Sequence, residues 1–133
     1  MAAEYDEREE TPWPVLATMG TTGTLMGTSL RLREYNPEIK IIGVEPYLGH
    51  KIQGLKNMKE SYQPGIFKKA RLHRIINIDD EEAYHTSRLM AKKEGLFAGM
   101  SSGAAMAAAL KLAGEMPKGR IVVILPDGGE RYL

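Results

Sequence analysis

A short glycine- and threonine-rich segment connects an apolar run to a helix-like pattern, and its residues are Gly20, Thr21, Thr22, Gly23 and Thr24. The first peptide N–H groups of a helix have no partner within the helix and carry partial positive charge. Glycines let an anion approach such a backbone closely, and threonine hydroxyls add neutral donors. We therefore expect this segment to bind a phosphate group. A tight turn that only begins a helix is the alternative.

Features missing from residues 20–24 exclude some kinds of phosphate ligand. It contains no lysine, which a P-loop NTPase requires, and it does not have the Gly-x-Gly-x-x-Gly spacing of a dinucleotide site. A hydroxyl-rich loop without a metal-binding side chain suits a permanently bound phosphate monoester, such as that of a cofactor, better than a transferred phosphate.

A second candidate site begins at Ser101, where Ser101-Ser102-Gly103 opens an alanine-rich run. Serine is a preferred helix N-cap, which is the simplest interpretation of these residues. A neutral hydroxyl here also suits a hydrogen bond to a heterocyclic nitrogen. The alanines would let the helix lie close to a sheet or to a flat ligand.

The elements that must position these residues follow from the apolar pattern. Strands are predicted at 15–19, 39–44, 74–78 and 120–125, and helices at 24–35, at 79–93 with Asp79 or Asp80 as its cap, and at 101–115. The segment 47–70 is predicted to be a loop with one short helix near 54–58. Strands that alternate with helices and are apolar throughout predict an α/β fold, a three-layer αβα domain with a mostly parallel sheet. Ligands of such sheets bind beyond the carboxyl ends of the strands.

Composition excludes several classes of function. The chain has 133 residues and a net charge of +1, which gives no electrostatic reason to expect nucleic acid or a membrane as a partner. It has no cysteine, which excludes disulfides, zinc thiolates and a cysteine nucleophile. The three histidines are scattered and predict no metal site. Residues 1–14 are expected to form a flexible acidic leader, and a cytoplasmic location is the default expectation.

Several motifs in one order give the chain a family resemblance from about Val15 to Leu133. They are Met-Gly-Thr-Thr-Gly-Thr, Ile-Ile-Gly-Val-Glu-Pro, Lys-Ile-Gln-Gly-Leu, Pro-Gly-Ile-Phe, Glu-Gly-Leu-Phe-Ala-Gly-Met-Ser-Ser-Gly-Ala-Ala and Gly-Glu-Arg-Tyr-Leu. Together they resemble the cysteine synthase (O-acetylserine sulfhydrylase) family of fold-type II pyridoxal-phosphate enzymes. The Thr-Thr form of the loop is similar to the cysteine synthase B branch.

The resemblance implies a function and roles for single residues. The family replaces the acetate of O-acetylserine, a small amino-acid substrate, with sulfide to give cysteine. Residues 15–133 would be part of the large domain. Ser101 would face the pyridine nitrogen of pyridoxal 5'-phosphate, and a serine there suits elimination of a β-substituent. The remaining implied positions are Gly20 to Thr24 at the cofactor phosphate, Ile52, Gln53 and Gly54 at the mouth of the active site, and Asp127 in a supporting role beside the nitrogen edge.

The chain departs from the family pattern in one respect that bears on the implied cysteine synthesis. The family places its Schiff-base lysine and its small domain before the phosphate loop, whereas here about twenty residues precede the loop and the first lysine is Lys40. No lysine matches the family motif, so we expect no catalytic residue in this chain and no cysteine synthesis by the chain alone. Uncovered sheet edges predict a homo-oligomer or a complementing chain. The alternatives are a non-catalytic scaffold or regulatory module with a phosphate site, or part of a cystathionine β-synthase-like enzyme or a threonine dehydratase.

Overall fold

The computed structural model describes residues 14–18, 23–47, 49, 51–52, 55, 72–116 and 119–129. Strands and helices alternate along these residues as the apolar pattern predicts. Their order is β1 (Val15–Thr18), α1 (Gly23–Tyr35), β2 (Ile41–Pro46), β3 (Arg74–Ile78), α2 (Asp80–Leu89), a π-helix η2 (Met90–Glu94), α3 (Met100–Glu115) and β4 (Val122–Val123). Apart from Pro14 and Leu55, the leader predicted at 1–14 and the helix predicted near 54–58 lie outside the described residues, as does the end of the chain from residue 130.

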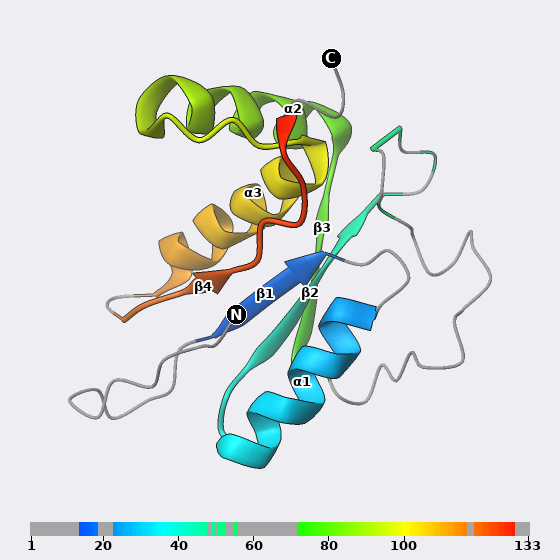
Figure 1. Ribbon diagram of the computed structural model, residues 1–133, viewed down its shortest axis with the longest axis vertical. Coiled ribbons are helices and arrows are strands. Elements are labelled where there is room, and N and C mark those ends of the chain that lie inside the picture. The colour runs from blue at the N-terminus through cyan, green and yellow to red at the C-terminus, as the bar shows by residue number, and fades with distance from the viewer. Residues whose placement is uncertain are drawn as a thin grey trace.

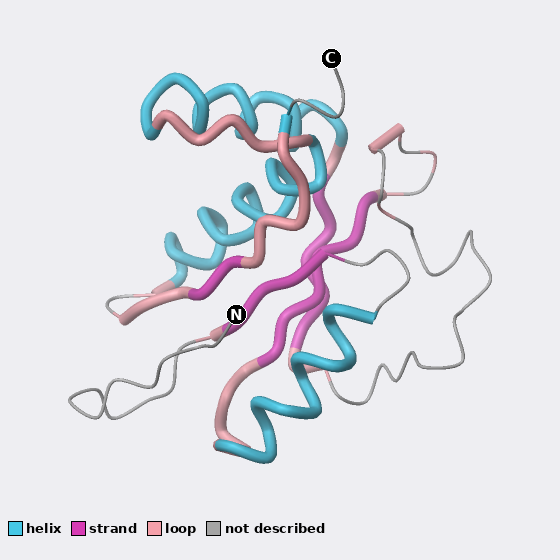
Figure 2. Tube along the Cα trace, in the orientation of Figure 1, coloured by secondary structure: helices cyan, strands magenta, loops and turns pink. Residues whose placement is uncertain are grey.

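The four described strands form one sheet in the order β3-β2-β1-β4. All three strand pairs are parallel, with Leu16 opposite Ile42 in the centre of the sheet. Helix α1 lies on one face of the sheet, and α2 and α3 lie on the other (Figures 1 and 2). The predicted three-layer αβα architecture is therefore confirmed.

Each face of the sheet has its own apolar core, because alternate strand residues point to opposite faces. Leu16 and Val44 belong to the cluster under α3, while Val15 and Ile41 belong to the cluster under α1. Both faces of the central strands are thus buried, which explains why these strands are continuously apolar in sequence.

The predicted bounds of two strands are wrong. We expected Glu45-Pro46 to end the second strand, but β2 continues through Pro46, which is opposite Ile78 of β3. Proline is tolerated there because the pairing with β1 stops at Val44, so no neighbour on that side needs its missing N–H. The last strand is also shorter than predicted, since β4 pairs with β1 over only two residues, Val122 and Val123, at an edge of the sheet.

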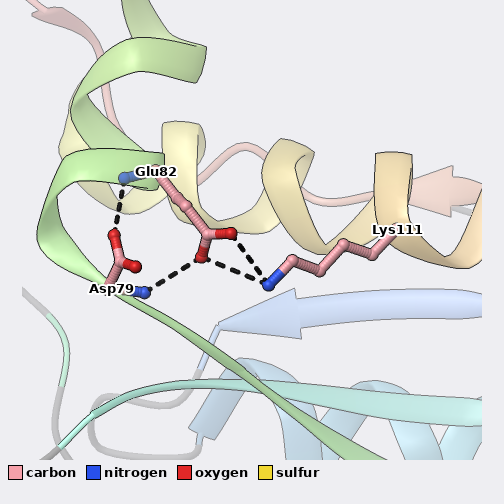
Figure 3. Close-up of polar contacts among 3 residues, drawn as sticks. All are labelled: Asp79, Glu82 and Lys111. Carbon is pink, nitrogen blue, oxygen red and sulfur yellow. Dashed lines mark hydrogen bonds and ion pairs between the residues drawn. The ribbon is translucent and has the colours of Figure 1, made fainter.

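The predicted cap of α2 is confirmed at Asp79 (Figure 3). Asp79 Oδ1 accepts the Glu82 N–H at 2.8 Å, and Glu82 Oε2 accepts the Asp79 N–H at 3.3 Å, which completes a capping box. Lys111 of α3 reaches the same carboxylate, with Nζ 3.0 Å from Glu82 Oε1. Figure 3 shows that these three side chains connect the start of α2 to α3.

Beyond Leu89 the helix widens into the π-turn of η2 and ends at Gly95, whose φ of 68° is left-handed. The glycine end was predicted, and the π-turn was not. None of the helices in the described segments has the length and apolar character needed to cross a membrane.

Helices α2 and α3 approach each other through small residues. Ala83, Ala104 and Ala108 are fully buried between them and the sheet. Gly103 lies against α2, where an added Cβ would overlap the Ala83 carbonyl oxygen and come within 2.9 Å of Ser87 Cβ. This crossing places the first turn of α3 against the middle of α2.

Candidate functional site

Two helices begin on the side of the sheet where its parallel strands end (Figure 1). Helix α1 begins at Gly23, a few residues after β1 ends at Thr18. Helix α3 begins at Met100, and hydrogen bonds join its first turn to Asp127, which follows β4. Both segments predicted to bind ligand groups therefore contribute to the edge of the sheet where α/β domains bind ligands.

The N-terminus of α1 is open to an anion. Gly23 and Thr24 are exposed, and the first turn of α1 contains no acidic side chain. The partial positive charge of this helix end is therefore not neutralised from within its first turn. The predicted phosphate-binding residues Gly20, Thr21 and Thr22 lie outside the described residues, so their part in the loop stays a prediction.

The N-terminus of α3 is occupied by a side chain of the protein itself. Its N-cap, Gly99, provides no side-chain cap, and Asp127 takes that place. Asp127 Oδ1 accepts the Ser102 N–H at 3.1 Å and lies 2.6 Å from Ser102 Oγ. The carboxylate satisfies a helix N–H group and adds negative charge at the positive end of α3. The simple reading of this turn, a serine N-cap, is therefore wrong, because the capping group comes from a residue 25 positions further along the chain.

These two helix ends differ in the ligand groups that they suit. A second anion at α3 would meet the Asp127 carboxylate, so a phosphate favours α1 on charge alone. Ser101 is 4% exposed, and its hydroxyl has no hydrogen-bond partner among the described residues. A neutral nitrogen or hydroxyl of a ligand could be bound there. The donor set thus fits a phosphorylated heterocycle, with its phosphate at α1 and its ring at α3.

The predicted mouth of the site is described only in part. Ile52 is 2% exposed and belongs to the apolar core under α3, so its side chain is directed into the protein. The neighbouring Lys51 N–H donates to Asp80 Oδ2 at 2.9 Å, which ties this segment to the start of α2. Gln53 and Gly54 lie outside the described residues. A role of the three mouth residues stays a prediction.

Among the described residues, the lysines are exposed and one histidine has a structural partner. All five lysines of the described segments are exposed, namely Lys40, Lys51, Lys92, Lys93 and Lys111. His73 accepts the Ile41 N–H at 3.0 Å, which gives it a structural role at the other end of the strands. No group of three or more metal-binding side chains occurs within the described part of the chain.

Ser102 is the residue that inspection of the sequence missed. It is fully buried, and both its N–H and its hydroxyl bond to Asp127. The sequence offers two adjacent serines and does not reveal which one is used internally. The only indication of this contact in the sequence is the segment Pro126-Asp127-Gly128-Gly129, in which a carboxylate follows a predicted strand.

Comparisons with known proteins identify the family of the chain. The model of the pyridoxal-phosphate-dependent enzyme family matches residues 1–127. The chain is 50% identical to a cysteine synthase from Aquifex aeolicus, covering 89% of this chain and 38% of that protein. It is 41% identical to cysteine synthase B from Pseudomonas aeruginosa, covering 89% of this chain and 40% of that protein.

A solved structure, the cysteine synthase from Entamoeba histolytica, superposes with a TM-score of 0.81 at 39% identity, covering 90% of this chain and 38% of that one. The chain spans about two-fifths of the length of the curated relatives that it matches. The resemblance drawn from the motifs is confirmed, and the chain belongs to the family of pyridoxal-phosphate-dependent enzymes.

Proposed function

We propose that this chain is the part of a cysteine synthase that binds the cofactor phosphate and ring. The complete enzyme would replace the acetate of O-acetylserine with sulfide, releasing acetate and forming cysteine. Residues 15–133 would be the C-terminal portion of its large domain. The observation that carries the proposal is the contrast between the two helix ends, one open to an anion and the other closed by Asp127 beside an available Ser101 hydroxyl.

The residues of this chain would act by binding and orientation. The N–H groups and hydroxyls that begin α1 would bind the cofactor phosphate. Ser101 would hydrogen-bond the ring nitrogen without supplying a charge. Bound pyridoxal phosphate supplies an electron-accepting ring for chemistry at an amino acid. A neutral partner at its nitrogen suits reactions in which charge leaves with a β-substituent such as acetate.

The catalytic base would come from outside these 133 residues. The exposure of all five described lysines fits surface positions rather than a buried amine beside a cofactor. We propose that the chain alone binds the cofactor without making cysteine. A complementing segment, from the same polypeptide or another, would supply the lysine and cover the short edge strand β4 and exposed apolar side chains such as Leu110.

The test measures cofactor binding by titration calorimetry. The chain should bind pyridoxal phosphate, inorganic phosphate should compete, and borohydride should leave no pyridoxyl group on any lysine. Thr24→Val should weaken binding at least about tenfold, because it removes one hydrogen bond to a charged group. Thr28→Val, the same change one turn further along α1, is the matched control and should bind as the wild type does. Equal losses in both variants, or binding that phosphate does not compete, would contradict the proposed site.

A further inference from the structure

We propose that Asp127 is a positioning residue that fixes the first turn of α3 through Ser102 and so holds the Ser101 hydroxyl toward the ring nitrogen of pyridoxal phosphate. The inference rests on the proposed function. It assigns to Asp127 an indirect role rather than contact with the cofactor.

Several hydrogen bonds join the start of α3 to the segment that follows β4. We call the bonds of Asp127 to Ser102 and Gly99 the clasp. Beyond the two bonds of the carboxylate, Ser102 Oγ lies 3.0 Å from the Asp127 carbonyl oxygen and 3.3 Å from its N–H. The Gly99 N–H donates to the Asp127 carbonyl oxygen at 3.3 Å. A bridge between Ala98 and Gly128 extends the contact by one residue on each side. Both the backbone and the side chain of Asp127 are therefore engaged.

The clasp leaves Ser101 available because of helix geometry. Successive residues of an α-helix point about 100° apart, so Ser102 can face Asp127 while Ser101 faces another direction. Gly103, on the other side of Ser102, is held against Ala83 of α2. The turn is thus fixed by α2 and by Asp127, and it cannot rotate about the helix axis without breaking one of these contacts. The orientation of Ser101 follows from this restraint.

The bonds of the clasp predict how strongly each of three substitutions should loosen the first turn of α3. Asp127→Ala removes the side-chain acceptor for both Ser102 groups but keeps the backbone bonds of residue 127 to Ser102 and Gly99, so it should loosen the turn without freeing it. Asp127→Asn keeps an oxygen acceptor of similar shape, so it should retain most of the restraint. Ser102→Ala keeps the N–H bond to the carboxylate and loses the hydroxyl bond, so its effect should be intermediate.

The experiment compares two ligands on the chain of 133 residues. One is pyridoxal phosphate, and the other is its analogue with a benzene ring in place of the pyridine. Titration calorimetry should show that the wild type prefers pyridoxal phosphate by about fivefold, the value expected for one neutral hydrogen bond. Ser101→Ala should abolish this preference. Asp127→Ala should reduce it, and adding Asp127→Ala to Ser101→Ala should change the preference no further.

A control variant at the other end of α3 distinguishes an effect on the orientation of Ser101 from a general loss of stability of the fold. Leu112→Ala removes a buried side chain from the last turn of α3 and should lower the melting temperature without changing the ligand preference. If Asp127→Ala lowers the melting temperature but keeps the fivefold preference, Asp127 is only structural and the inference is overturned. Should Asp127→Ala fail to fold, Ser102→Ala must reduce the preference, or the inference fails.

The wild type alone distinguishes this inference from the proposed function. Binding of both ligands with equal affinity would overturn the role of Ser101 and Asp127, while the phosphate site would stand. No binding of either ligand would refute the proposed function, and the inference would fall with it.

Discussion

The crossing of α2 and α3 allows a sharp test, because the same substitution should act in opposite directions at two places on α3. Gly103 has no space for a side chain, since its Cβ would overlap the carbonyl oxygen of Ala83. Gly114, near the other end of α3, has no atom within 4 Å of the position of an added Cβ. Neither glycine has a positive φ, so alanine suits the backbone at both.

The expected magnitudes follow from two opposing effects. Alanine in place of glycine favours a helix by up to about 1 kcal/mol, and by about 0.5 kcal/mol near a helix end. At Gly103 the obstructing atom belongs to the backbone, so α2 itself must move, and such overpacking costs about 3 kcal/mol. Gly103→Ala should therefore lower the free energy of unfolding by about 2 kcal/mol, whereas Gly114→Ala should raise it by about 0.5 kcal/mol.

Urea unfolding followed by far-UV circular dichroism measures both variants. For a chain of this length, a loss of about 2 kcal/mol corresponds to a fall in melting temperature of about 7 °C. The dependence of the unfolding free energy on urea should be unchanged, which would show that the effect lies in the folded state. If Gly103→Ala proves as stable as Gly114→Ala, the close approach of α3 to Ala83 does not limit this interface, and the reasoning is refuted.

Two further predictions concern individual contacts. Asp79→Ala should lower the unfolding free energy by about 1 kcal/mol through loss of the cap. Lys111→Met should change it by less than about 0.5 kcal/mol, because the side chains of that ion pair are 44% and 37% exposed. The reverse order in urea unfolding would contradict this. Burial, together with nearby Arg33 and Lys40, lowers the pKa of His73 below its usual 6.5. The unfolded chain then binds the proton more readily, so stability should fall as the pH drops from about 6.5 to the folded pKa. His73→Gln should flatten this dependence in melting curves, and a slope that stays the same would assign it to another group.

Local signals explain which parts of the fold were predictable from the sequence. Strand β3 has the predicted bounds because its apolar run ends at Asp79, whose cap depends only on the next three residues. The end of β2 at Pro46 depends on how far the neighbouring strands extend, and this is not written near Pro46. The π-turn at Met90–Glu94 likewise has no local signal that we identified.

The same distinction holds at the candidate site. The segment that ends at Thr24 was recognisable because glycine, threonine and a following helix suffice to suggest an anion site. The contact of Ser102 with Asp127 was not recognisable, since it depends on the position of Asp127 in space. The sequence therefore predicted a helix start at this turn but not which of the two serines bonds within the protein, and the role of Ser101 stays a prediction.

The position of β1 in the middle of the sheet has a consequence for the order of folding. Strand β1 pairs with β2, which is near in sequence, and with β4, which comes from the far end of the described chain. Contacts between distant segments close large loops and are expected to form late. Because Asp127 follows β4 by only a few residues, the clasp on α3 should form together with this last strand pair. A chain that has folded β1, β2 and β3 but not β4 would then have the open end of α1 and no fixed Ser101, so ring recognition would become possible only at the final step of folding.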